Sequence, residues 1–233
     1  MRTAKTAQIV RKLVFDGARI SIAYGTPSSG NFDACLFLAH GVRSTMNSSN
    51  ISYLHEELAR RGFLTVKFNF PFAEGRARFL KRSNSKNVLV ESYRRVVEAV
   101  RESEWKPKNL YLGGISLGAA VASHVVSDGP APIGVRGLFF LAYPLNLPRK
   151  PDAVTDSHLD KISIPMLFVS GTRDIYADER TLKSTVSRLG SKAQLHLVYA
   201  DHGFNRRSGM TLYSKTLTEV AGAVADWADK QQG

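Results

Sequence analysis

Cysteine, cofactor motifs and long hydrophobic runs are all scarce or missing in this chain. Its 233 residues include a single cysteine, Cys35, so an internal disulfide is excluded, and the apolar run around Cys35 predicts a small buried side chain. No group of cysteines and histidines has the spacing of a zinc site, and no phosphate-binding glycine pattern of the Walker A or Rossmann kind occurs. We therefore expect neither a metal nor another cofactor.

The hydrophobic runs are short. The longest nearly unbroken run extends from Leu138 to Leu147 and is interrupted by Pro144 and Asn146, which is far too little to span a bilayer. The first residues carry charge but no apolar stretch follows them, so no signal peptide is predicted. With 43% apolar and 22% charged residues, the composition is typical of a soluble globular protein, and we expect a cytoplasmic location.

Acidic residues are outnumbered by basic ones. There are 32 lysines and arginines against 20 aspartates and glutamates, which gives a net charge of +12. Segment 76–108 is strongly basic, and such a segment can bind nucleic acid, an anionic membrane or an acidic partner. It lacks interleaved aromatic residues and any nucleic-acid motif, so we favour a solvated basic face and expect no nucleic-acid partner. Its basic residues are Arg76, Arg78, Lys81, Arg82, Lys86, Arg94, Arg95, Arg101, Lys106 and Lys108.

What the sequence does contain is a regular alternation of apolar runs and amphipathic segments. Strands are predicted over 7–15, 18–24, 34–39, 63–70, 109–113, 137–143, 166–170 and 194–199, the first two as an antiparallel pair. Helices are predicted over 50–61, 86–103, 117–126, 177–189 and 211–229. This order implies a single α/β domain over residues 1–233, with a mostly parallel sheet covered by helices on both faces. Functional sites of such sheets form at the carboxyl ends of the strands.

The most informative motif is a serine between two glycines. Residues 114–118 read Gly-Ile-Ser-Leu-Gly, which matches the G-x-S-x-G nucleophile elbow, and a predicted strand and helix flank them as that motif requires. On such a sharp turn the Ser116 hydroxyl is pushed out of the sheet, and the new helix supplies N–H groups where an oxyanion would form. The bare pattern is expected by chance about 0.1 times in a chain of this length, so a glycine-rich turn with an incidental serine is the alternative.

A serine nucleophile needs a base, and the base needs an acid that orients it. The acid and the base are expected after the serine in the chain. Asp174 follows the strand at 166–170, and His202 follows the strand at 194–199. The alternatives are that Asp174 caps the next helix, that Asp178 or Asp201 is the acid, and that His202 is an ordinary loop residue. The other histidines fit less well, because they lie in predicted helices, in a strand or in an unassigned segment: His55, His124, His196 and His158.

A histidine and a glycine follow the strand at 34–39. An His40-Gly41 pair at this place suggests an oxyanion loop, in which an N–H near Val42 or Arg43 faces the developing charge and Leu117 N–H is the second donor. His40 then shapes the loop and is not the base. An ordinary turn is the alternative.

Substrate-binding residues are expected around the same edge of the sheet. We assign this role to His40, Gly41 and Arg173. A further hypothesis is that Arg43, Arg173 and Arg206 favour an anionic acyl or leaving group through charge-assisted hydrogen bonds. Scattered surface arginines are the equally open alternative.

Five segments together resemble a known family: AHG at 39–41, FNFP at 68–71, GGISLG at 113–118, VSGTRD at 169–174 and DHGF at 201–204. The chain resembles small serine α/β-hydrolases of the dienelactone-hydrolase-like type over roughly residues 33–229. It is especially similar to the testis-expressed and KANSL3-type hydrolase-like proteins. The resemblance implies that Ser116 is the nucleophile, Asp174 the acid and His202 the base. Dienelactone hydrolases themselves carry cysteine at the elbow, so their lactone substrate is not implied.

The segment between Tyr143 and Ile164, where many relatives insert a helical lid, is only about 20 residues long and rich in proline. We therefore predict little or no lid and an open cleft. The expected function is hydrolysis of ester, thioester or related acyl bonds of a small substrate, without a cofactor. The alternative is a catalytically idle protein of the same fold that binds partners through its basic surface. The sequence leaves the oligomeric state open.

Overall fold

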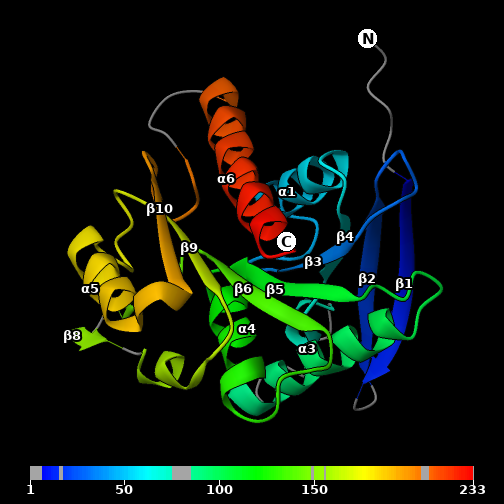
Figure 1. Ribbon diagram of the computed structural model, residues 1–233, viewed down its shortest axis with the longest axis horizontal. Helices are drawn as coiled ribbons and strands as arrows, with labels where there is room; N and C mark the ends of the chain where they lie inside the picture. Colours follow the sequence, from blue (N-terminus) through cyan, green and yellow to red (C-terminus); the bar gives the residue numbers. More distant parts are fainter. Residues whose placement is uncertain are drawn as a thin grey trace.

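An eight-stranded sheet runs through the centre of the molecule (Figure 1), which is described here from a computed structural model. The structure describes residues 7–15, 18–74, 85–147, 150–154, 156–205 and 210–232. The strand order is β1-β2-β4-β3-β5-β6-β9-β10. The strands are β1 (Ala7–Phe15), β2 (Ala18–Thr26), β4 (Leu64–Phe68), β3 (Ala34–Ala39), β5 (Asn109–Ile115), β6 (Val135–Leu141), β9 (Met166–Gly171) and β10 (Ala193–Val198).

The sheet is mostly parallel. Only the pairs β1–β2 and β2–β4 are antiparallel, and every pair from β4 to β10 is parallel. This arrangement confirms the predicted α/β fold class. The turn predicted at Asp16-Gly17, between the first two strands, lies outside the described residues.

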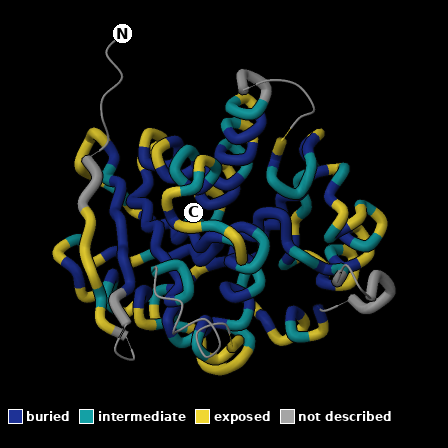
Figure 2. The backbone as a smooth tube through the Cα atoms, turned by 180° about the vertical axis from the view of Figure 1, so that it is seen from behind, coloured by how far each residue is buried: buried dark blue, intermediate teal, exposed yellow. Residues whose placement is uncertain are grey.

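Helices cover both faces of the sheet (Figure 1). On one face lie α1 (Ser49–Arg60) and α6 (Met210–Lys230), and on the other lie α3 (Lys86–Arg101), α4 (Leu117–Ser127) and α5 (Glu179–Leu189). Each helix buries an apolar stripe against the strands, so the core forms two layers. Figure 2 shows that the central strands are buried, whereas the edge strand β1 is largely exposed, at residues 10–12 and 14.

Most predicted elements differ from the observed ones by two residues or fewer at each end. Strand β4 is shorter than predicted and ends at Phe68. It ends early because the chain turns away there: the Phe70 N–H donates to a ring nitrogen of His40 instead of a neighbouring strand. Two short elements after β6 were not predicted, β7 (Asn146–Leu147) and β8 (Lys150–Val154), which form a separate antiparallel pair.

The stretch between β6 and β9 carries no α-helix among its described residues. Besides β7 and β8 it contains one short 3-10 helix, η3 (Ser157–Lys161). This agrees with the prediction of little or no lid. The remaining short helices are η1 (Pro71–Ala73) and η4 (Gly190–Lys192). In the described part of the chain, the helices are too short or too polar to cross a membrane.

Candidate active site

The turn from β5 to α4 holds Ser116 in an unusual backbone conformation. Its φ is 54° and its ψ is −114°, a region that non-glycine residues avoid and that costs about 1–3 kcal/mol. The flanking glycines make the turn possible: a Cβ on Gly114 would lie 2.5 Å from the Ala39 carbonyl oxygen, and one on Gly118 would lie 2.3 Å from it. Both glycines are therefore required because the end of β3 is in contact with the turn.

Three predicted side chains meet at the carboxyl edge of the sheet. Ser116 Oγ lies 2.9 Å from His202 Nε2. The other ring nitrogen of His202, Nδ1, lies 2.9 and 2.8 Å from the two carboxylate oxygens of Asp174. In the tautomer that satisfies both contacts, Nδ1–H donates to the carboxylate and the serine hydroxyl donates to Nε2. This arrangement leaves the imidazole able to accept the proton of the serine.

Close packing of two strand ends brings the acid and the base together. Asp174 follows β9 and His202 follows β10. A Cβ on Gly171, the last residue of β9, would lie only 2.3 Å from the Ala200 carbonyl oxygen in the loop after β10. Only a glycine permits this approach. Gly171 in the VSGTRD segment is therefore required for the loops after β9 and β10 to pack together.

Neighbouring groups fix the orientation of the Asp174 carboxylate. Its side chain is fully buried and accepts hydrogen bonds from Tyr176 N–H at 2.8 Å and from the Ser170 hydroxyl at 3.4 Å. The Tyr176 ring also packs on the His202 ring, with 4.4 Å between the centroids. Sequence reasoning missed Ser170 and Tyr176. An aspartate side chain in a turn often accepts a hydrogen bond from the backbone N–H two residues later. The spacing from Asp174 to Tyr176 could therefore have predicted this hydrogen bond from the sequence.

The two rival aspartates have other partners. Asp178 caps α5, accepting from Thr181 N–H at 3.0 Å and from the Thr181 hydroxyl at 2.6 Å. Asp201 accepts from the N–H groups of Gly203 and Asn205, each at 2.9 Å, and so shapes its own loop. Of the three candidate acids, only Asp174 contacts His202 in the described structure.

His40 is buried and has both ring nitrogens occupied. Its Nδ1–H donates to the Gly41 carbonyl at 2.8 Å, and its Nε2 accepts the Phe70 N–H at 3.0 Å. Burial lowers the pKa of His40 to about 4, so the ring is neutral near pH 7. The rings of Phe70 and Phe72 pack edge-on against it. Its side chain is therefore not available to a substrate, contrary to the predicted binding role, and His40 positions the loop instead.

The loop held by His40 lies against the elbow. A Cβ on Gly41 would be 3.8 Å from Ser116 Cβ. Because the C=O and N–H of one trans peptide point in opposite directions, fixing the Gly41 carbonyl toward His40 turns the Val42 N–H the other way. Leu117 is the first residue of α4, so its N–H has no acceptor within the helix. Of the N–H groups predicted to face an oxyanion, those of Val42 and Leu117 are therefore better supported by the structure than that of Arg43. Arg43 is an exposed residue that follows Val42.

Of the three arginines predicted near the site, Arg173 is the one whose contacts the structure describes. Arg173 donates to the Asn205 carbonyl at 3.4 Å, and its guanidinium lies 4.6 Å from the centre of the Tyr199 ring. These contacts tie Arg173 to the His202 loop. Arg206 lies outside the described residues. Among the described residues there is no group of three or more histidine, cysteine or acidic side chains that could hold a metal ion.

Comparison with known proteins agrees with this architecture. The family described as "Alpha/beta hydrolase domain" matches residues 32–229. The fold is similar to that of a dienelactone hydrolase from Anabaena variabilis, with 18% identity, 96% of this chain and 97% of the other covered, and a TM-score of 0.74. An esterase from Pyrococcus furiosus has 15% identity, coverages of 98% and 94%, and a TM-score of 0.76.

A third similar structure is an α/β serine hydrolase from Xanthomonas campestris that is described as lacking a lid. Its identity is 16%, its coverages are 98% of this chain and 96% of the other, and its TM-score is 0.71. At these identities the likeness shows the fold, while the family match over residues 32–229 shows the membership. The chain therefore belongs to the alpha/beta hydrolase domain family.

Proposed function

We propose that the protein is a serine hydrolase that cleaves ester, thioester or related acyl bonds through an acyl-enzyme. The observation that carries the proposal is the unbroken line of short contacts from Ser116 Oγ through the His202 ring to the buried Asp174 carboxylate. The unusual backbone at Ser116 adds support, because strain of this kind is retained where it serves function.

The proposed reaction has two steps, acylation of Ser116 and hydrolysis of the acyl-enzyme, and the same residues act in both. Ser116 Oγ attacks the acyl carbon while its proton passes to His202 Nε2, and Asp174 stabilises the imidazolium that results. The oxyanion accepts hydrogen bonds from the N–H groups of Leu117 and Val42. The proton on Nε2 then goes to the leaving alcohol or thiol. A water molecule, activated by the same nitrogen, releases the acid and restores the serine.

We expect small, accessible substrates. Val42 in the oxyanion loop is 60% exposed, and Ile175 beside the acid is 80% exposed, so both apolar side chains are available to a substrate. With no α-helix among the described residues between β6 and β9, the nucleophile needs no lid movement before it meets a substrate. No step requires a cofactor. Arg43 is the described arginine best placed to favour an anionic substrate.

The alternative of an idle scaffold with a basic binding face receives less support. The described basic side chains of α3 are largely engaged within the molecule. Lys86 pairs with Asp128, Arg95 pairs with two glutamates of its own helix, and Arg94 donates to backbone carbonyls. The other basic residues of segment 76–84 lie outside the described residues.

The proposal includes three further predictions from the sequence. These are a single domain over residues 1–233, a cytoplasmic location, and a place in the testis-expressed and KANSL3-type group of hydrolase-like proteins.

The test compares two serines of the same region. Ser116→Ala should reduce the hydrolysis of p-nitrophenyl acetate by roughly 10⁴-fold or more, as expected for a member of a catalytic triad. Ser123→Ala is the matched control, because Ser123 also contacts a histidine but is buried within α4. It should keep near-normal turnover. Unchanged turnover in the folded Ser116→Ala variant would refute the proposal.

A further inference from the structure

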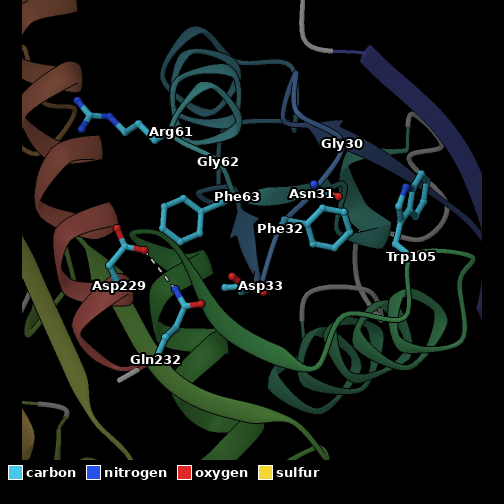
Figure 3. Close-up of a pocket in the computed structure, with 11 residues that line it drawn as sticks. Gly30, Asn31, Phe32, Asp33, Arg61, Gly62, Phe63, Trp105, Asp229 and Gln232 are labelled. Carbon is cyan, nitrogen blue, oxygen red and sulfur yellow. Dashed lines mark hydrogen bonds between the residues drawn. The ribbon is translucent and has the colours of Figure 1, made fainter.

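The recess shown in Figure 3 is separate from the candidate active site. It has a volume of about 490 Å³ and lies at the amino ends of β3 and β4, whereas Ser116 follows the carboxyl end of β5. Because β3 alone is six residues long, about 20 Å separates the two edges of the sheet. The Phe63 side chain is buried in the core, and Asp33 and Asp229 are exposed, so the recess does not enclose a ligand. The groups that can act on the proposed reaction lie at the carboxyl edge.

At the carboxyl edge, the half-buried ring of Tyr176 lies against the ring of the proposed base. The centroids of the Tyr176 and His202 rings are 4.4 Å apart, and the ring planes are inclined by 51°. In the described structure, ring pairs that meet edge-on have centroids at least 4.8 Å apart. The shorter distance therefore indicates that the faces of the Tyr176 and His202 rings overlap in part.

Hydrogen bonds on both sides of Tyr176 hold its ring in this place. Its N–H donates to the Asp174 carboxylate at 2.8 Å, and its carbonyl accepts the N–H of Asn146, in β7, at 2.8 Å. The next residue, Ala177, is fully buried. A backbone movement that carried the ring away from His202 would have to break the hydrogen bond to the proposed acid. The short β7 strand thus helps to fix the Tyr176 ring on the imidazole.

The charge of His202 changes during the proposed reaction. The imidazole is neutral before Ser116 attacks, and it is an imidazolium from the attack until Nε2 gives its proton to the leaving group. The face of an aromatic ring attracts a cation within about 6 Å of the ring centre, and a neutral imidazole lacks this attraction. The contact with Tyr176 is therefore stronger in the transition state than in the ground state. Only an interaction of this kind raises kcat.

A second tyrosine at the same edge provides a contrast. The Tyr199 ring already has a permanent cation, since the Arg173 guanidinium lies 4.6 Å from its centre. Within the described part of the chain, Tyr176 has no such cation and its hydroxyl has no hydrogen bond. The face of the Tyr176 ring is therefore free to act on the charge that forms on His202.

We propose that the face of the Tyr176 ring stabilises the His202 imidazolium, which makes Tyr176 a positioning residue that acts through the base. This inference rests on the proposed function, because the imidazolium forms only if His202 takes the proton of Ser116. The imidazolium forms both in the acylation of the serine and in the hydrolysis of the acyl-enzyme. Whichever of the two steps is slower, kcat depends on the ring.

The first test compares a variant that keeps the ring with one that removes it. Tyr176→Leu keeps an apolar side chain but removes the aromatic face, and it should lower kcat for p-nitrophenyl acetate by roughly 3- to 30-fold while KM stays near the wild-type value. Tyr176→Phe should restore kcat to near the wild-type value, because the hydroxyl has no partner. Tyr199→Leu is the matched control, since it removes a ring from the same edge that does not contact His202, and it should leave kcat unchanged.

The second test changes the charge of the ring face but not the shape of the ring. Pentafluorophenylalanine at position 176 has an electron-poor face, so its kcat should be at least as low as that of Tyr176→Leu. This variant also decides the question if Tyr176→Leu does not fold. Equal kcat with phenylalanine and pentafluorophenylalanine, equal losses in Tyr176→Phe and Tyr176→Leu, or a loss confined to KM would each overturn the role of the ring. Turnover that persists in Ser116→Ala would instead refute the proposed function, and the role of Tyr176 with it.

Discussion

Two serine–histidine pairs lie close together in this molecule, and only one has the surroundings that the proposed reaction requires. Ser116 Oγ is 2.9 Å from His202 Nε2, and Ser123 Oγ, two turns further along α4, is 2.8 Å from His158 Nε2. A search by distance alone would not separate them. Their surroundings differ in every other respect that matters for a nucleophile.

The Ser123 hydroxyl already donates its proton to another acceptor, whereas the Ser116 hydroxyl can donate to its histidine. Ser123 is fully buried, and its hydroxyl donates to the Ala120 carbonyl at 2.7 Å. With that proton engaged, His158 Nε2 must be the donor toward Ser123, so it is not a base for that serine. The His158 ring is stacked on the His124 ring, with 3.9 Å between the centroids. His202, by contrast, contacts the buried carboxylate of Asp174. The orienting acid and the strained, half-buried turn therefore distinguish Ser116, the proposed nucleophile, from Ser123.

Replacing each of the two histidines should give the largest difference in turnover between the two serine–histidine pairs. His202→Gln should reduce kcat/KM for p-nitrophenyl acetate by roughly a thousandfold or more, because the base is lost. His158→Gln should keep turnover near normal and lower the free energy of unfolding by about 1–2 kcal/mol, because the contacts of the His158 ring to Ser123 and Tyr143 are lost. Steady-state kinetics and urea unfolding measure the two effects. A large loss of turnover in His158→Gln would show that both pairs serve catalysis.

Replacing two aspartates tests the orienting acid. Asp174→Asn should lower kcat by about 10³- to 10⁴-fold, because an amide no longer selects the tautomer with a proton on Nδ1. Asp178→Asn makes the same chemical change four residues later, where asparagine is also a good helix cap, and should leave kcat and stability close to normal. Similar kcat values for the two variants would contradict the role given to Asp174.

The fold and the three central side chains could be predicted because their signals are local. Buried parallel strands read as continuous apolar runs, and each candidate residue directly follows its own strand. The sequence favoured Asp174 and kept Asp178 and Asp201 as alternatives, because the contact that distinguishes them, between Asp174 and His202, joins two loops that are distant in the chain.

Two other features needed coordinates. The burial of His40 follows from packing against Phe70 and Phe72 after a strand that ends early. The β7–β8 pair escaped prediction because β7 has only two residues and proline-rich neighbours.

The smallest predicted effect concerns pH and stability. Burial, with a contribution from His124, lowers the pKa of His158 to about 4, and burial lowers that of His40 to about 4 as well. Between about pH 6.5 and 4 the unfolded chain takes up protons that the folded chain does not, so the free energy of unfolding should fall as pH decreases through this range. His158→Gln should make the fall shallower by about 1 kcal/mol, allowing for partial exposure. Urea unfolding across this range measures the slope, and an identical slope in the variant would contradict it.

The central claim is that Ser116 is the serine made reactive by its surroundings. Its most direct test is labelling of the folded full chain with a fluorophosphonate probe, followed by mass spectrometry of the modified peptide. We predict one label per chain, located on Ser116, with Ser123 unmodified. Labelling of another residue, or no labelling of well-folded protein, would contradict the account.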